Sequence, residues 1–444
     1  MGHAGRIKDE YRALSRRLEA GQVGFPEPAS ERAWNGWKEI LEILFTPAEA
    51  ALAARLPTKP TTLERIAARV GVPAMELLPR LDALCDRGVV MDFPDPKTGK
   101  LRYLLAPPVV GFIEFSLMRA SDSIPKKRMA DALEAYFQGD DTFAREAFGG
   151  ETTIGRALAH ETALEEDLSD VLSWERATSL ITEASQVAVS LCYCRHKAEH
   201  LGEQCDAPVE TCLSLNGGAE HVIRRGFGRA IDKAEASDIL QRSRAMGLVQ
   251  VADNIKKRPI YVCNCCGCCC EQLRSVSHYG IGAVNPSGFQ PAFDDDRCKG
   301  CSKCARACPI GAITMKPTRE AARRKTELSP ALDEERCIGC GVCVDSCNNH
   351  AMKLTRSGRQ RDVPDSTLER VVRMAVERGH LADLMFDQGE SRSAWFLNRL
   401  TRAILALPPA QAALANKQLR SRFVRGLMAR LKGSKPRPVV AAAP

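Results

Sequence analysis

The strongest constraint on this chain is a cysteine pattern that occurs twice in its last third. The pattern runs Cys298-x2-Cys301-x2-Cys304-x3-Cys308-Pro309 and then Cys337-x2-Cys340-x2-Cys343-x3-Cys347. Two residues between ligands let a tight loop reach successive corners of one iron–sulfur cube, whereas the ligand three residues further on has turned towards a second cube. The spacing therefore predicts that eight thiolates hold two [4Fe–4S] clusters, and it favours electron transfer.

The two halves also align outside the cysteines, because Asp296-Arg297-Cys298 matches Glu335-Arg336-Cys337 at an offset of 39 residues. On these motifs, residues 291–355 resemble the bacterial-type 2[4Fe–4S] ferredoxins. The resemblance implies that ligands cross between the halves, since the fourth cysteine of each run ligates the other cluster in that family. One cluster would be held by Cys298, Cys301, Cys304 and Cys347, and the other by Cys337, Cys340, Cys343 and Cys308.

Three features depart from the ferredoxin pattern. Asn348 replaces the proline that follows the first run, His350 replaces a glycine, and the spacer 316–335 is long and polar. None of these changes removes a ligand, so both clusters are still expected. Zinc is the alternative for so many cysteines, but zinc sites rarely place three ligands at successive steps of two intervening residues.

Apart from Cys85, ten further cysteines lie upstream, in two groups. The first is Cys192-x-Cys194-x10-Cys205-x6-Cys212, and the second crowds six cysteines into residues 263–270. Each group follows a short apolar run, 187–191 or 259–262, and such a run indicates a buried strand. Cys192 and Cys194 would face the same side of that strand, since strand side chains repeat every two residues.

We expect at least one additional metal centre here, an iron–sulfur cluster, with free thiols or loosely bound zinc as the alternative. Adjacent cysteines cannot all bind one cube because their side chains diverge, so some of the six are spare or serve a second site. The arrangement resembles larger ferredoxin-type proteins of anaerobic metabolism. The candidate ligands are Cys192, Cys194, Cys205, Cys212, Cys263, Cys265 and Cys266.

The front of the chain predicts a winged-helix-like domain over residues 31–115. Helices at 61–70 and 73–87 each end at a glycine, and two apolar runs that flank a polar tip then indicate a hairpin. This order resembles the winged-helix domains of bacterial regulators. The second helix, however, carries two arginines against three acids, and phosphate neutralisation dominates DNA affinity. Protein docking or packing is therefore favoured over DNA binding.

The net charge of +8 is matched by one segment alone. Residues 415–438 hold eight basic side chains and no acidic one, and apolar residues recur there at helical spacing. This pattern predicts a basic amphipathic helix that lies on an anionic membrane surface, docks on an acidic partner or packs on its own domain.

The composition favours the cytoplasm, with peripheral contact at the inner membrane face as an addition. Cysteine motifs of this kind indicate reduced, metal-binding thiols rather than a disulfide scaffold. The hydrophilic start predicts no signal peptide, and no window is long and apolar enough to predict a transmembrane helix.

Together these features predict a multidomain α+β protein. After the winged-helix-like domain, the expected order is a helical region at 116–185, a small α/β cysteine-rich domain at 186–290, the 2[4Fe–4S] ferredoxin-like domain at 291–355 and a helical basic tail at 364–433.

The leading hypothesis is an electron-transfer protein that exchanges single electrons with a partner oxidoreductase. The sequence contains no Walker motif, nucleophile elbow or dinucleotide fingerprint, so a nicotinamide or flavin site is not expected. Lys299, Lys303 and Arg306 in the first cluster loop would favour an acidic docking face on the partner. Two alternatives remain: a reductase whose catalytic centre is the upstream cysteine field, and a redox-sensing winged-helix transcription regulator.

Overall fold

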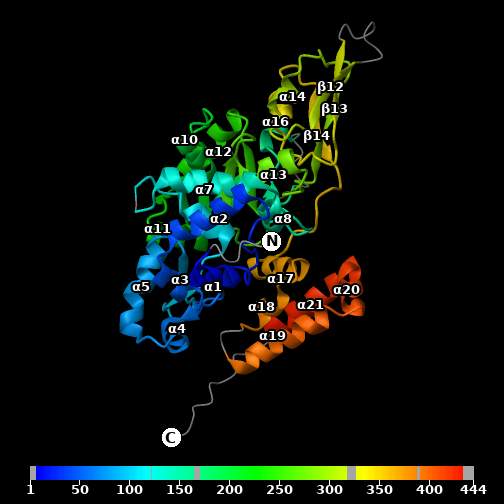
Figure 1. Cartoon of the computed structure of the whole chain (residues 1–444). Coiled ribbons are helices and arrows are strands. Elements are labelled where there is room, and N and C mark those ends of the chain that lie inside the picture. The colour runs from blue at the N-terminus through cyan, green and yellow to red at the C-terminus, as the bar shows by residue number, and fades with distance from the viewer. Residues whose placement is uncertain (1–6, 122, 165–170, 318–326, 388–390, 434–444) are drawn as a thin grey trace.

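The computed structural model describes residues 7–121, 123–164, 171–317, 327–387 and 391–433. Within these ranges the protein mixes helices and strands in several domains (Figure 1). The main body is built around a seven-stranded sheet. A smaller unit that contains the two cysteine runs, residues 289–356 and here named the repeat module, stands at one end of this body.

The front of the chain packs helices over a three-stranded antiparallel sheet with the strand order β1-β3-β2. Gly71 ends the first predicted helix in the left-handed conformation, with φ +67°. The second predicted helix continues through Pro79, which is exposed, so the carbonyl that loses its hydrogen-bond donor there faces water. The elements are α1 (Asp9–Leu18), α2 (Glu31–Leu44), α3 (Pro47–Ala53), β1 (Thr61–Thr62), α4 (Leu63–Val70), α5 (Ala74–Asp86), β2 (Val90–Pro94) and β3 (Leu101–Leu105).

The next helices pack against the front of the chain through α2. Trp34 and Trp37 of α2 are buried in one core with Tyr136. Helices α2 and α7 (Lys126–Gly139) approach closely at Gly36, where a Cβ would lie 2.4 Å from the carbonyl oxygen of Ala132. The helices of this part are α6 (Ile113–Phe115), α7 (Lys126–Gly139), α8 (Thr142–Phe148) and α9 (Ala177–Glu183).

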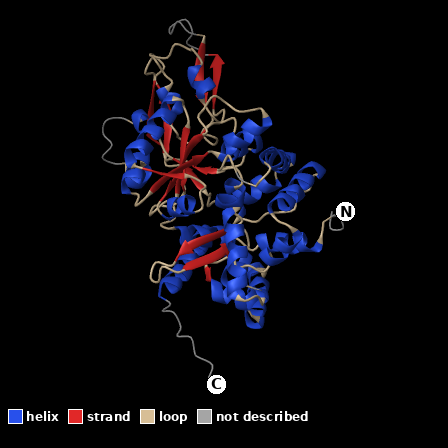
Figure 2. Ribbon diagram, turned by 90° about the vertical axis from the view of Figure 1, so that its left-hand side faces the viewer, coloured by secondary structure: helices blue, strands red, loops and turns tan. Residues whose placement is uncertain are grey.

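The large sheet has the strand order β10-β4-β8-β9-β6-β5-β7 and is antiparallel except where β10 lies beside β4. In Figure 2 it lies between the strands of the repeat module and those of the small front sheet. β4 belongs to the segment 116–185 that we expected to be helical. The strands are β4 (Gly155–Ala157), β5 (Val187–Leu191), β6 (Glu210–Leu215), β7 (Arg229–Ile231), β8 (Val249–Asp253), β9 (Tyr261–Cys265) and β10 (Val284–Asn285).

Alternation along these strands gives the sheet two different faces. Val189, Leu213 and Val262 join one apolar core with α9 and α12. Cys212 and Cys263 belong to the opposite face, where residues from the front of the chain cover them. The remaining helices of this domain are α10 (Tyr193–Leu201), α11 (Gly217–Arg224), α12 (Lys233–Ala245) and α13 (Glu271–Tyr279).

In its described residues, the repeat module contains two short antiparallel pairs, β11 with β14 and β12 with β13, and the short helices α14 and α16. The polar spacer between the cysteine runs begins at the end of β12 and includes β13. Residues 318–326 of the spacer lie outside the described ranges. The bounds are β11 (Phe289–Phe293), α14 (Lys303–Ala307), β12 (Ile313–Pro317), β13 (Leu328–Leu332), α16 (Val342–Asp345) and β14 (Met352–Arg356).

The C-terminal region is helical, as the sequence indicated. The apolar residues Val424 and Met428 of α21 are buried against Val372 and Leu381, so this side of the basic helix packs on its own domain. Among the helices of the described residues, none is long and apolar enough to cross a membrane. The bounds are α17 (Thr367–Glu377), α18 (Leu381–Met385), α19 (Arg392–Leu405), α20 (Pro408–Ala415) and α21 (Lys417–Gly433).

Candidate metal centres

The two cysteine runs have nearly the same backbone. Left-handed residues recur at the repeat offset of 39, at Gly300 and Gly339, at Ser302 and Gly341, and at Gly311 and His350. The two halves also share a hydrogen bond. In each half, the backbone N–H four positions after the last cysteine donates to the sulfur of that cysteine, from Ala312 to Cys308 at 3.2 Å and from Ala351 to Cys347 at 3.4 Å. His350 therefore keeps the turn that the glycine makes in the first half.

Cysteines from the two runs lie close together in the repeat module. Cys308 of the first run lies with Cys337, Cys340 and Cys343 of the second run around one small pocket. Cys347 and Cys304 belong to one apolar cluster, which also contains Cys308 and Cys343. Cys298 and Cys301 lie near enough to Cys304 for their charges to raise its pKa further, in addition to the effect of burial.

Burial differs between the two groups. Cys301 is exposed, whereas Cys340 and Cys343 are buried. Burial raises the pKa of Cys340 to about 12, so a bound cation is needed to hold this thiol as a thiolate. The residues present fit an iron–sulfur cluster, because they offer four convergent sulfur ligands and backbone N–H groups that donate to sulfur.

The repeat module is fixed to the large sheet by His160, which is fully buried. Its Nδ1 lies 2.7 Å from Asp345 Oδ2 of α16, and its Nε2 lies 2.9 Å from the carbonyl oxygen of Leu248. Its backbone N–H donates to the carbonyl of Cys340 at 2.9 Å. These three contacts tie the repeat module to the segment after β4 and to the residue before β8.

A second contact joins the repeat module to the upstream cysteines. A Cβ on Gly267 would lie 2.1 Å from the carbonyl oxygen of Pro309, the residue that follows Cys308. Gly267 stands between Cys266 and Cys268, so the absence of a side chain there lets the upstream cysteine loop rest directly on the ferredoxin-like loop.

The ten upstream cysteines divide into two sets. The sulfur atoms of one set all lie within 4.8 Å of one another, and this set consists of Cys205, Cys266, Cys268 and Cys269. The other six line a cavity of about 310 Å³, which Cys266 also borders, and they are Cys192, Cys194, Cys212, Cys263, Cys265 and Cys270. The candidate ligands expected from the sequence are thus shared between two places, with Cys205 and Cys266 in the first set.

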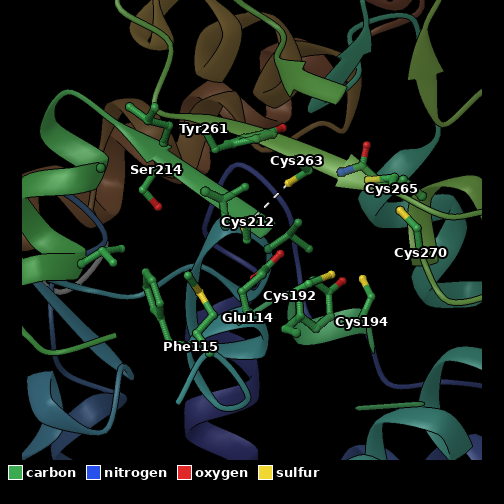
Figure 3. Close-up of a pocket in the computed structure, with 18 of the residues that line it drawn as sticks. Glu114, Phe115, Cys192, Cys194, Cys212, Ser214, Tyr261, Cys263, Cys265 and Cys270 are labelled. Carbon is green, nitrogen blue, oxygen red and sulfur yellow. Dashed lines mark hydrogen bonds between the residues drawn. The ribbon is translucent and has the colours of Figure 1, made fainter. Parts of the chain in front are cut away.

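Strand alternation and two helix starts bring the six cavity cysteines together. Cys263 and Cys265 project from one face of β9, and Cys212 of β6 lies beside them, with its sulfur 3.9 Å from that of Cys263. Cys270 precedes the first turn of α13. Figure 3 shows the labelled cysteines around one common space, and Glu114 and Phe115 of α6 also line this space.

The expectation that Cys192 and Cys194 extend a strand is wrong. β5 ends at Leu191, Cys192 is the N-cap of α10, and Cys194 lies in the first turn of that helix. The two thiols still face the same cavity, but the positive end of a helix dipole now lies beside them. The N-terminus of α13 acts on Cys270 in the same way, so two helix starts favour negative charge in this space.

Several buried ionisable groups surround the cavity. Burial raises the pKa of Cys194 well above its ordinary value, whereas hydrogen bonds from the thiols of Cys194 and Cys265 lower the pKa of Cys270 to about 6. Burial also raises the pKa of Glu114 to about 7. The site therefore mixes neutral thiols, an acid that titrates near neutral pH and helix starts that favour anions.

Arg195 is a fully buried cation between the two cysteine sets. It donates to the carbonyl of Asn264 at 3.0 Å and to the hydroxyl of Thr211. Burial lowers the pKa of Arg195, but the electrostatic influence of Cys192 and Cys266 outweighs this effect and raises it, so the guanidinium keeps its charge.

Sequence reasoning missed four residues of these sites: Cys268, Cys269, Cys270 and Glu114. For the cysteines, the signal was Gly267, which interrupts the run and marks the turn between β9 and α13. Glu114 carried no such signal, because it reaches the cavity only when the front of the chain packs on the sheet.

Residues 297–351 match the protein family described as a 4Fe-4S dicluster domain. The match identifies this part of the chain as a ferredoxin-type domain that binds [4Fe–4S] clusters and points to an iron–sulfur electron-transfer or redox function. The ten upstream cysteines lie outside the matched residues. Comparisons with curated proteins and with solved structures found no match for this chain.

Proposed function

We propose that the protein passes single electrons through two [4Fe–4S] clusters to or from a partner oxidoreductase. Cys298, Cys301, Cys304 and Cys347 would hold the outer cluster, and Cys337, Cys340, Cys343 and Cys308 the inner one. The observation that carries this proposal is the pocket that Cys308 shares with three cysteines of the other run. When bound, the clusters supply one-electron chemistry, and the protein sets their potentials through nearby charge and hydrogen bonds.

The outer loop has the properties of a docking end. Cys301 is exposed, and the side chains of Lys299, Lys303 and Arg306 around it are exposed as well. These cations support an acidic docking face on the partner, because complementary charge steers two proteins into encounter. The inner cysteines lie against the large sheet instead, through His160 and Gly267.

Iron and sulfide counting on anaerobically purified protein tests this function. We expect about eight irons per chain from the repeat module alone and electron paramagnetic resonance signals of two reduced cubes. Cys308→Ser should perturb the inner cluster and Cys347→Ser the outer one. Colourless protein, or zinc bound at the eight repeat positions, would refute the proposal.

A second candidate function, a reductase, is favoured by the cysteine-lined cavity. The cavity wall also includes apolar and aromatic side chains, among them Phe115, Tyr193 and Tyr261, which suits a small apolar substrate. The test is to reduce the protein and follow cluster reoxidation by small apolar electron acceptors. Reoxidation that slows in Cys263→Ser, with the repeat clusters intact, supports a reductase, and equal rates contradict it.

A DNA-binding regulator has less support. The winged-helix-like residues 31–115 pack onto the cysteine-rich domain, since Asp82 and Asp86 of α5 each bind Arg225 at 3.0 Å. Met91 and Phe93 of β2 line the cavity. We propose that this part of the chain forms a wall of the cavity. Gel shifts with genomic fragments, with the clusters intact and removed, would contradict this role if they detected sequence-specific binding.

We also propose a cytoplasmic location with peripheral contact at the inner membrane face through the basic segment 415–438. Residues 434–438 of this segment lie outside the described ranges. In α21, Leu419 and Phe423 are exposed, as are Arg422 and Arg425. Flotation with anionic vesicles should show binding that falls with salt and with Arg422→Gln/Arg425→Gln. Equal binding to neutral vesicles would contradict the electrostatic part of this proposal.

A further inference from the structure

We infer that Cys205, Cys266, Cys268 and Cys269 form a separate site for a single tetrahedral metal ion, zinc or iron. The sulfur atoms of all four lie within 4.8 Å of one another. The distance is 3.7 Å between the sulfurs of Cys268 and Cys269 and 4.0 Å between those of Cys269 and Cys205. Four sulfur ligands are the donor set that zinc takes in structural sites.

The size of this group distinguishes one metal ion from a cluster. A metal–sulfur distance of about 2.3 Å in a tetrahedron places the four sulfurs about 3.8 Å apart. The two shorter distances lie close to this value. An iron–sulfur cube holds its cysteines on four irons that are themselves separated by bridging sulfides, so its ligands stand further apart. The group is therefore compact enough for a single ion.

The local backbone explains how neighbouring cysteines converge here although strand cysteines diverge. β9 ends at Cys265, and residues 267–269 form a turn before α13. The backbone N–H of Cys270 donates to the carbonyl of Cys266 across this turn at 3.3 Å, which reverses the chain and brings three thiols to the same side. Cys205 approaches from the loop after α10, whose last turn is closed by Gly202 with φ +73°.

The position of this site gives it a second property. Gly267, inside the ligand loop, touches the backbone of Pro309 directly after Cys308, and Cys266 borders the cysteine-lined cavity. The ion would thus stand between the repeat module and the cavity. Bound iron would lie on a path for electrons, whereas zinc, which has no redox chemistry, would fix the loop against the module.

Metal analysis of variants tests the site. Cys268→Ser/Cys269→Ser should lose one zinc or one iron per chain, while the resonance signals of the [4Fe–4S] clusters stay unchanged. Cys85→Ala removes a buried thiol from α5 and serves as the control that keeps the ion. Mössbauer spectra distinguish a tetrathiolate iron from zinc. Because Cys268 is exposed, the single variant Cys268→Ser leaves the core packing intact.

The single variant provides a second readout in folded protein. We expect it to lose the ion to a chelator at least about tenfold faster than the wild type, at unchanged cluster content. Loss of no metal from the double variant, or of about four irons together, would overturn a single-ion site. Since cluster signals are followed in the same samples, failure of the two-cluster proposal is recognised separately.

Discussion

Asp92 offers the sharpest test of how the front of the chain is held to the cysteine-rich domain. Its side chain is fully buried, and its two neighbours in β2, Met91 and Phe93, line the cavity. One carboxylate oxygen lies 2.7 Å from Arg225 and the other lies 3.2 Å from Arg224 and from His221. Asp92→Asn leaves the two guanidinium groups facing a neutral amide, and it should therefore weaken the packing of the front of the chain.

The expected cost follows from the burial of the charges. Breaking a buried ion pair from one side costs about 3–5 kcal/mol. Arg225 also binds Asp82 and Asp86, so its charge stays partly compensated, and we expect about 3 kcal/mol, at the lower end of that range. With a urea dependence of about 2–3 kcal/mol per M, the unfolding midpoint should fall by about 1 M or more.

The pH dependence of this difference has a definite sign. Burial raises the pKa of Asp92, but hydrogen bonds from His221, Arg225 and Arg224 outweigh it and hold the pKa well below its ordinary value of 3.8. The ionised carboxylate therefore stabilises the fold fully above the unfolded pKa, and this stability is lost as pH falls towards the folded pKa. The gap between wild type and Asp92→Asn should be full at pH 7 and shrink below about pH 4.

Urea unfolding followed by tryptophan fluorescence measures this effect, since Trp34 and Trp37 are buried in the front core. Asp131→Asn is the matched control, because Asp131 pairs with Lys127 and both side chains are more than half exposed. That surface pair contributes at most about 1 kcal/mol. Equal midpoints for the two variants at pH 7, or a gap that persists undiminished at pH 3, would refute the reasoning.

Three further changes have defined outcomes. Replacing Lys299, Lys303 and Arg306 together with Glu should lower the potential of the outer cluster in film voltammetry, because these cations favour its more negative reduced state; an unchanged or higher potential contradicts this. His160→Gln should lower the free energy of unfolding by about 1–3 kcal/mol and speed hydrogen exchange in β11 and β14. Unchanged exchange would contradict the idea that His160 holds the repeat module in place. Gly267→Ala should lower the free energy of unfolding by about 1–3 kcal/mol, because the added methyl group clashes with Pro309. Gly426→Ala is the control and should not destabilise the protein, because no atom lies within 4 Å of the added methyl group. Equal unfolding midpoints for the two variants would exclude the clash.

The features that the sequence predicted well are local ones. The spacing of the repeat cysteines can be read within a run of about ten residues. The helices and the hairpin at the front of the chain follow from hydrophobic periodicity and from glycines that end helices, such as Gly71. The offset between the halves aligns Gly311 with His350, and both adopt the left-handed conformation.

The features that it could not predict depend on partners far along the chain. β4 is only three residues long, so its sequence shows no alternation of apolar and polar residues. Its Arg156 can be buried because the carbonyl oxygens of Asp253 and Ile255 accept hydrogen bonds from the guanidinium group. Cys205 meets Cys266 only after α10 and the sheet have formed. Likewise, no pattern within 415–438 reveals that α17 and α18 cover Val424 and Met428.

Burial and charge order the cysteine sites from the surface inwards. Cys301 is exposed among cations, Cys340 is buried against the sheet, and the loop around Gly267 then leads from Pro309 to the cavity. Arg195 adds a fixed, buried positive charge beside the innermost cysteines. A cation in a low-dielectric surrounding favours the reduced form of a neighbouring redox centre more than one in water does. If the cavity or its neighbouring site holds iron, this guanidinium would therefore raise the reduction potential of that iron.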